Sequence, residues 1–339
     1  MKKWLIKTAF LLLTTILLFV IIAWGYEAWV FRAFRQTLDR SDFYQLDSLA
    51  GHVHAPNTTQ TIYWPEHASD SVTMATNNLG FKEDAPSYPK DTNYLVLVTG
   101  DSHTDGVVNN SESFPNLLEQ QIEGLTAHNG GTGFYTFQNY SGFYEKYRSL
   151  NPDLFLITVY TGNDFIETYL YNQENRNAWT SLQTFWYRIR KKIVKRQTGI
   201  MSSQASAQAL FFKMYPKKKA QVVQQATEHL KNILQACTND SVELQVLLLP
   251  TQLDVDPKRR AKLKWSEADL NINRQITLDL MDQLDTLGIP YIDLLPGFQE
   301  TPEGLFWNRD QHLSVKGHTR VAELIEKQIR ISNELNGSN

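Results

Sequence analysis

The chain has little of what usually marks a metal-binding, disulfide-bonded or nucleic-acid-binding protein. Cys237 is the one cysteine among 339 residues, so no internal disulfide can form, and no cysteine and histidine cluster has the spacing of a zinc site. The formal net charge is −3, which gives no overall attraction to nucleic-acid phosphates. His52 and His54 alone are too small a set to indicate a metal. We therefore expect no metal, no cofactor and no nucleic-acid partner.

Charge is also missing near the N-terminus, and this absence indicates a membrane helix. Residues 8–26 contain no charged side chain, and the run has roughly the 20 residues that a helix needs to cross a bilayer. Three lysines precede it, so the positive-inside tendency places residues 1–7 in the cytoplasm and exports everything after Tyr26. A cleaved signal peptide is the alternative, although its apolar region is typically only about 7 to 15 residues long.

After the N-terminal segment, apolar β-branched runs alternate with helical stretches. Continuous apolar runs are typical of strands that helices cover on both faces. Such runs occur at residues 95–98, 154–159, 242–249 and 291–294, with a shorter and only partly apolar run at 134–138. Helices are expected at residues 114–122, 221–236, 267–287 and 315–331. This order predicts an α/β protein whose three α/β/α layers surround a parallel sheet.

Three polar blocks carry the residues of a serine hydrolase. Ser102, in Gly-Asp-Ser-His-Thr-Asp-Gly, and Asn163, in Gly-Asn-Asp, each follow an apolar run, where open α/β sheets bind ligands. Asp310 and His312 precede the last helix. A serine hydroxyl becomes a useful nucleophile when a histidine accepts its proton and a carboxylate orients that histidine. The alternative is that Ser102 and the Asp310–His312 pair only cap helices.

In this order the blocks resemble the SGNH or GDSL family of serine esterases and acyltransferases. The likeness covers about residues 77–328, including Asn-Asn-Leu-Gly-Phe at 77–81. It implies a flavodoxin-like fold, with Ser102 as nucleophile, His312 as general base and Asp310 as its orienting carboxylate. The family usually has two residues between Asp and His, whereas this chain has one, a variant associated with membrane-linked, polysaccharide-modifying relatives.

The resemblance also implies an oxyanion hole. Its donors would be the backbone N–H groups of Ser102 and of a glycine, together with the side-chain amide of Asn163. Two glycine blocks compete for that position, one at residues 129–133 and one at 139–142. We prefer Gly142, because the run at 134–138 would supply a strand before it.

These observations divide the chain into a cytoplasmic tip, a transmembrane anchor, a juxtamembrane and lead-in segment, an SGNH hydrolase-like domain and a tail, at residues 1–7, 8–26, 27–92, 93–333 and 334–339. The domain would carry an insertion at about 168–219. Within it, residues 185–196 are basic and aromatic. A solvated helix with one buried face is the favoured interpretation, and contact with an anionic membrane or an acidic glycan is the alternative.

The expected protein is a single-pass enzyme of the inner membrane with a periplasmic catalytic domain. It would hydrolyse acyl esters, above all O-acetyl esters, of a cell-envelope or exported polysaccharide, so its partners would be an acylated carbohydrate and the membrane. No protein partner can be named from the sequence. The same triad could instead transfer the acyl group to a sugar. A catalytically idle glycan-binding or assembly module is a third possibility, and the intact Ser102 and His312 argue against it.

Overall fold

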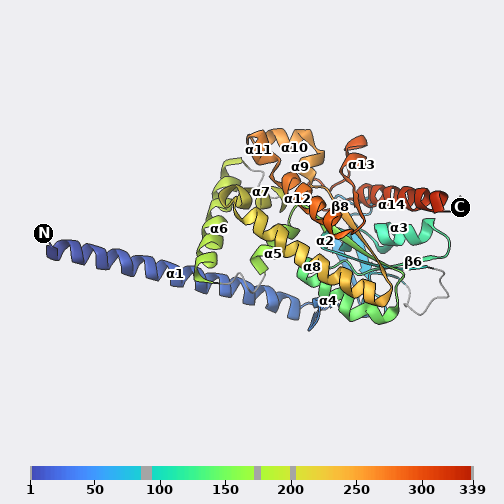
Figure 1. The fold of residues 1–339 in the computed structure, drawn as a ribbon, viewed down its shortest axis with the longest axis horizontal. Helices are drawn as coiled ribbons and strands as arrows, with labels where there is room; N and C mark the ends of the chain where they lie inside the picture. Colours follow the sequence, from blue (N-terminus) through green and yellow to red (C-terminus); the bar gives the residue numbers. More distant parts are fainter. Residues whose placement is uncertain (1, 85–93, 172–176, 199–203, 337–339) are drawn as a thin grey trace.

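A parallel five-stranded sheet forms the centre of the protein in the computed structural model, which describes residues 2–84, 94–171, 177–198 and 204–336 (Figure 1). The strand order is β6-β5-β7-β8-β9, the order of flavodoxin-like sheets. The strands are β5 (Tyr94–Gly100), β6 (Leu125–Asn129), β7 (Leu154–Tyr160), β8 (Glu243–Leu249) and β9 (Tyr291–Asp293). Four of them lie where the sequence predicts a strand, and the flavodoxin-like parallel sheet is confirmed.

Helices bury both faces of this sheet and complete three layers (Figure 1). Leu97, Phe155 and Val246 pack on one side, against α4 (Phe137–Tyr147), α8 (Lys218–Asp240) and α12 (Ile272–Leu287). Val96, Leu156 and Leu247 pack on the other, against α3 (Phe114–Gln121), α13 (Leu295–Glu300) and α14 (Val315–Asn336). The shorter elements are α2 (Ser102–Asp105), α5 (Asp164–Tyr171), α7 (Gln204–Met214), α9 (Gln252–Val255), α10 (Pro257–Lys262) and α11 (Glu267–Leu270).

Two sequence predictions about these elements are wrong. The helix expected at 267–287 is interrupted at Asn271, so α11 and α12 are separate. The second strand is β6 and not residues 134–138. Every residue of β6 is buried, but its polar side chains find partners, as in the 2.7 Å contact between His128 Nδ1 and Glu83 Oε1. Its sequence therefore lacks the apolar run that signals a buried strand. Residues 134–138 instead form a turn and the start of α4, with Thr136 as its N-cap.

The segment before the sheet comprises one long helix and two hairpins. The helix α1 (Lys2–Asp39) continues without a break through the expected anchor and juxtamembrane segment, and it projects away from the domain (Figure 1). In the described part of the chain it is the single helix long and apolar enough to span a membrane. The hairpins pair β1 (Tyr44–Asp47) with β2 (Gly51–His54) and β3 (Thr59–Tyr63) with β4 (Ser71–Ala75). The expected boundary at residues 92 and 93 lies outside the described residues.

Gly142 lies inside α4 and does not follow a strand, contrary to the expectation for an oxyanion-hole glycine. A Cβ atom at this position would lie 2.0 Å from the carbonyl oxygen of Leu49 and 3.0 Å from the Cα of Ala50, in the turn between β1 and β2. The absence of a side chain here lets the hairpin pack directly on α4. Gly142 therefore serves packing.

This position yields a stability prediction. We expect Gly142→Ala to lower the free energy of unfolding by about 1–3 kcal/mol, because the added methyl group overpacks against backbone atoms that cannot rotate away. Ser141→Ala, at the residue directly before Gly142 in the same helix, is the matched control and should be near neutral. Denaturant unfolding of both variants measures the difference. If Gly142→Ala had unchanged stability but reduced turnover, the packing role would be contradicted and a role for Gly142 in the active site would be supported.

Candidate active site

The nucleophile candidate lies at the carboxyl end of β5, directly after Gly100 and Asp101. Gly100 has no room for a side chain, since a Cβ there would lie 2.1 Å from Thr104 Oγ1 and 2.9 Å from the Thr158 carbonyl oxygen. Asp101 caps α2, and its carboxylate accepts a 2.8 Å hydrogen bond from the backbone N–H of His103. This tight turn leaves Ser102 at the edge of the sheet, half-buried, as the first residue of α2.

Ser102, His312 and Asp310 come together in one hydrogen-bonded relay. Ser102 Oγ lies 2.7 Å from His312 Nε2, although 210 positions separate the two residues in the chain. His312 Nδ1 lies 2.6 Å from Asp310 Oδ2, so the carboxylate accepts the proton of that nitrogen and leaves Nε2 free to accept from the serine. The three residues nominated by the sequence therefore meet with the geometry of a nucleophile, a base and an orienting group.

A left-handed residue makes the short Asp-x-His spacing work. Gln311, between Asp310 and His312, has φ of 72°. Asp310 Oδ1 also accepts a 3.1 Å hydrogen bond from the backbone N–H of His312. The reversal at Gln311 folds Asp310 back onto the His312 ring.

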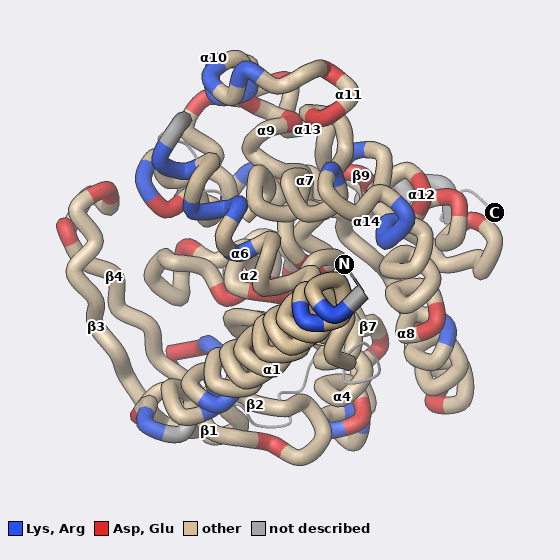
Figure 2. Tube along the Cα trace, turned by 90° about the vertical axis from the view of Figure 1, so that its left-hand side faces the viewer, with Lys and Arg blue, Asp and Glu red and all other residues tan. Residues whose placement is uncertain are grey.

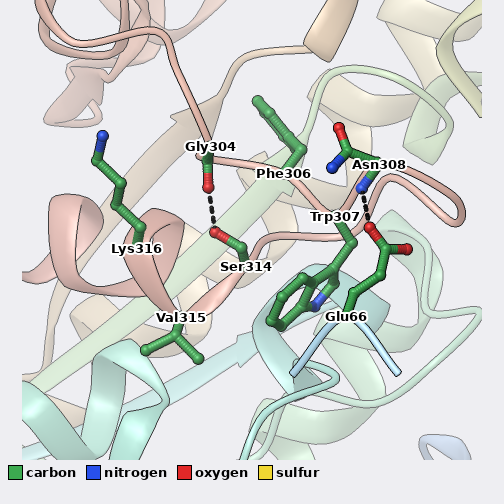
Figure 3. A pocket seen from close by; sticks show the side chains of 8 residues that line it. All are labelled: Glu66, Gly304, Phe306, Trp307, Asn308, Ser314, Val315 and Lys316. Atoms are coloured by element: carbon green, nitrogen blue, oxygen red, sulfur yellow. Dashed lines mark hydrogen bonds between the residues drawn. The ribbon is translucent and has the colours of Figure 1, made fainter. Parts of the chain in front are cut away.

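The loop before Asp310 is held from outside by a residue of the lead-in segment. Glu66 accepts a 2.7 Å hydrogen bond from the backbone N–H of Asn308 (Figure 3). It also accepts a 3.0 Å hydrogen bond from the backbone N–H of Arg309. Trp307 adds a 3.2 Å hydrogen bond from its indole N–H to the carbonyl oxygen of Val107. Glu66, Trp307 and Asn308 line a cavity of about 370 Å³ on this side of the loop. No member of the relay lines it, so this cavity is not where Ser102 would meet a substrate.

The titratable groups around the relay are tuned by burial and by one another. Burial by itself would lower the pKa of His312, but the hydrogen bond and negative charge of Asp310 raise it above its ordinary value. Burial raises the pKa of Asp101 to about 6, against the lowering effects of the His103 backbone, the charge of His312 and the Asn163 side chain. Burial lowers the pKa of His103 well below its ordinary value. The raised pKa of His312 fits a base that accepts a proton during a reaction.

Two candidates for the oxyanion hole lie near the start of α2, and neither is Gly142. Asn163 follows the neighbouring strand β7, and its side chain is one of the groups that lower the pKa of Asp101, the residue before Ser102. Gly133 belongs to the competing glycine block and follows β6. A Cβ atom on Gly133 would lie 3.9 Å from the Cβ of Ser102. Gly133 therefore has the place beside the nucleophile that the sequence prediction assigned to Gly142.

Sequence reasoning missed a buried charged cluster beneath α2. The ammonium group of Lys82 is fully buried, 3.9 Å from Asp105 Oδ1, and it donates a 2.7 Å hydrogen bond to the Gly106 carbonyl oxygen. Asp105 Oδ2 also lies 3.3 Å from His54 Nε2 and accepts a 3.2 Å hydrogen bond from Tyr44. The available signal was Lys82 directly after the Asn-Asn-Leu-Gly-Phe motif.

The lead-in segment also reaches the glycine block. His52 Nε2 donates a 2.7 Å hydrogen bond to the carbonyl oxygen of Gly133. His52 and His54 thus share one side of β2 and have separate partners, the glycine block and Asp105. The i, i+2 spacing therefore lets both histidines support the site, one at the glycine block and one at Asp105.

The pH dependence of turnover should report the relay. His312 must be neutral to accept the serine proton, so we expect kcat/KM to rise with pH through a midpoint above the ordinary histidine value of about 6.5. Asp310→Asn removes the charge that raises this pKa, so the midpoint should fall and maximal kcat should drop by a factor on the order of 10⁴. Rates measured from pH 5 to 9 test both effects. An unchanged midpoint in Asp310→Asn would mean that another group orients His312.

The conformation of Gln311 gives a second prediction. Glycine adopts positive φ without strain, so Gln311→Gly should retain the relay and most of the activity. Gln311→Ile should lose activity by tenfold or more, because a β-branched residue strongly disfavours this region and turns Asp310 away from His312. Steady-state rates and thermal unfolding of the two variants make the test. Equal activity in both would show that the backbone reversal is dispensable.

The C-terminal part of the chain is similar to one known family. Residues 205–339, which include Asp310 and His312, match a family model described as an SGNH hydrolase-like domain, acetyltransferase AlgX. A search of curated proteins finds no match.

Several solved structures are similar to this chain at low identity. An acetylxylan esterase, Axe2, from Geobacillus stearothermophilus has 13% identity and a TM-score of 0.45, covering 71% of this chain and 96% of that one. A putative G-D-S-L family lipolytic protein from Desulfitobacterium hafniense has 17% identity and a TM-score of 0.42, covering 69% and 99%. A G-D-S-L family member from Veillonella parvula has 14% identity and a TM-score of 0.40, covering 69% and 97%.

The matched model covers less than half of the chain. The sheet has the flavodoxin-like strand order, and the residues of the relay follow one another in the order Ser, Asp, His. Together these findings support an SGNH/GDSL-type hydrolase, and the family match itself is limited to residues 205–339.

Proposed function

We propose that this protein is a membrane-anchored serine esterase that removes acyl groups, above all O-acetyl groups, from a cell-envelope or exported polysaccharide. The observation that carries the proposal is the relay of Ser102, His312 and Asp310, with contacts of 2.7 and 2.6 Å. Three residues from two distant parts of the chain converge in an arrangement that activates a serine hydroxyl. A module that only binds glycans would need no such relay.

The proposed reaction proceeds through an acyl-enzyme. Ser102 Oγ attacks the ester carbonyl carbon while its proton passes to His312 Nε2, and the carbonyl oxygen becomes an oxyanion. When the tetrahedral intermediate collapses, the bond to the sugar oxygen breaks and His312 protonates that oxygen, which leaves as a free hydroxyl. Water then attacks the acyl-enzyme with His312 as base, releasing acetate and regenerating Ser102.

The oxyanion would be stabilised by donors on three adjacent segments. We assign the backbone N–H groups of Ser102 and Gly133 and the side-chain amide of Asn163 to this role. Gly133 replaces Gly142 because it lies beside the Ser102 side chain, while Gly142 packs under the β1–β2 turn. Loss of one oxyanion donor typically costs about 100- to 1,000-fold in rate. Asn163→Ala would be expected in that range.

The membrane location rests on α1. Its apolar stretch suits a single crossing, and the lysines before it favour a cytoplasmic N-terminus. The catalytic domain would then lie in the periplasm, attached to the inner membrane. An enzyme in this location has access to a cell-envelope or exported polysaccharide on the periplasmic side of the membrane. The net charge of −3 supports a carbohydrate in preference to a nucleic acid.

Acyl transfer is the second candidate function, and one observation favours it. The family model matching residues 205–339 is described by the name of an acetyltransferase. The two reactions share the same acyl-enzyme and differ in whether water or a sugar hydroxyl attacks it. Exclusion of water from the acyl-enzyme would decide between them.

One experiment tests the proposal and separates these outcomes. Purified full-length protein is incubated with acetylated glycans and with an aryl acetate, each with and without an unacetylated oligosaccharide acceptor. Acetate release independent of the acceptor indicates an esterase, and acetylated acceptor indicates a transferase.

The variants in that experiment test the relay. Ser102→Ala should lower turnover by at least about 1,000-fold, and adding His312→Ala should cost little more, because residues that act as one unit are not additive. Ser141→Ala is the control serine, on α4. Wild-type turnover in a folded Ser102→Ala variant would end the serine-esterase proposal.

A further inference from the structure

The helix α6 (Ala178–Thr198) crosses α1 where α1 would leave the membrane (Figure 1). The ring of Phe185 lies 5.6 Å from that of Phe19 and 5.5 Å from that of Tyr26, both edge-on. Arg188 Nε donates a 2.9 Å hydrogen bond to Glu27, the first charged residue after the apolar run. These contacts fix α6 beside the outer end of the proposed membrane span.

The contact residues set the depth of α6. Phe19 precedes Tyr26 by seven positions, which is about 10 Å along a helix. A helix that contacts both residues lies in the outer part of the bilayer, between acyl chains and headgroups, if α1 spans the membrane. That is the depth at which amphipathic interfacial helices bind.

The edge of α6 that faces the N-terminal part of α1 is apolar and uncovered. Trp179, Leu182 and Trp186 occur at i, i+3 and i+7, so they form one stripe. Trp179 is 68% exposed and Trp186 is 54% exposed. With Ile16, Phe19 and Val20 of α1, the stripe lines a groove of about 500 Å³. Two large exposed indoles beside a membrane span are typical of the bilayer interface.

The second half of α6 is strongly basic. Its exposed cations are Arg190, Lys192, Lys195 and Arg196. Figure 2, which looks from the N-terminal end of α1, shows this run of Lys and Arg along α6. Cations near an anionic leaflet each contribute about 1 kcal/mol to binding. Aromatic residues at one end and cations at the other match the acyl chains and phosphates of the same lipids.

We propose that α6 is an interfacial helix that docks the catalytic domain on the outer leaflet of the membrane. Trp179, Leu182 and Trp186 lie among lipid acyl chains, which fill the groove against α1, and the basic half binds lipid phosphates. The inference rests on the proposed anchoring by α1 and goes beyond it, since an anchor alone would leave the domain free to tumble on its tether. With two helices in the lipid, the domain has one orientation to the membrane.

Spin labels on single cysteines test this in full-length protein reconstituted into nanodiscs that contain anionic phosphatidylglycerol. Cys237 is buried, so the parent protein serves as the blank. The test position is Trp186→Cys. Leu17→Cys, at a 60% exposed position of α1, reports the anchor, and Leu278→Cys, at a 38% exposed position on α12, reports water. Collision with oxygen marks lipid, and collision with a water-soluble nickel chelate marks water. Circular dichroism melting confirms that each variant folds.

We expect the oxygen-to-nickel collision ratio of Trp186→Cys to be severalfold above that of Leu278→Cys and close to that of Leu17→Cys. A water-like ratio at Trp186→Cys with a lipid-like ratio at Leu17→Cys overturns the docking of α6 and leaves the anchor standing. A water-like ratio at both positions, or a chain that has lost α1, overturns the anchor as well. Spin–spin broadening at Trp186→Cys would mean that a second copy covers the stripe in place of lipid, which also overturns the proposal.

Discussion

The buried ammonium group of Lys82 is the interaction on which the candidate site depends. It lies 3.9 Å from Asp105 and donates to the Gly106 carbonyl oxygen, so it closes the turn that begins with Ser102. Burial lowers its pKa to about 8, opposed by the charge of Asp105. Burial alone would raise the pKa of Asp105, but His54 and Lys82 lower it. Removal of one partner from a buried ion pair costs about 3–5 kcal/mol, so each residue of the cluster requires the others.

This cluster explains why the chain before β5 belongs to the site. Lys82 follows the Asn-Asn-Leu-Gly-Phe motif, and His54 comes from the second strand of a hairpin. Glu66, after β3, holds the loop that carries Asp310 and His312. The sheet supplies the nucleophile and the last helix follows the base, while the lead-in segment ties the two together from outside. A truncation at about residue 93 would remove these supports and keep the relay residues.

The relation of α1 to α6 extends the same dependence to the membrane. The contacts of Phe185 with Phe19 and Tyr26, and of Arg188 with Glu27, join a helix of the catalytic domain to the helix that is long enough to span a bilayer. On the proposed topology, the distance of Ser102 from the lipid surface is a property of the fold. An enzyme held in this way would act on polymer that passes close to the membrane.

The sequence by itself determined the parallel α/β sheet, the long N-terminal helix and the nomination of Ser102, His312 and Asp310, because buried strands leave continuous apolar runs and the polar blocks have a distinctive order. It missed β6, whose buried polar side chains, such as His128, pair with partners that no local pattern reveals. Because the second strand was expected at residues 134–138 and not at β6, the sequence analysis preferred Gly142, which would follow that strand, to Gly133, which follows β6. Only the tertiary structure decided which glycine lies beside Ser102, how Gln311 folds Asp310 onto His312, and that Lys82, His54 and Glu66 support the site. Each of these depends on contacts between residues far apart in the chain, and local hydrophobic periodicity carries no record of them.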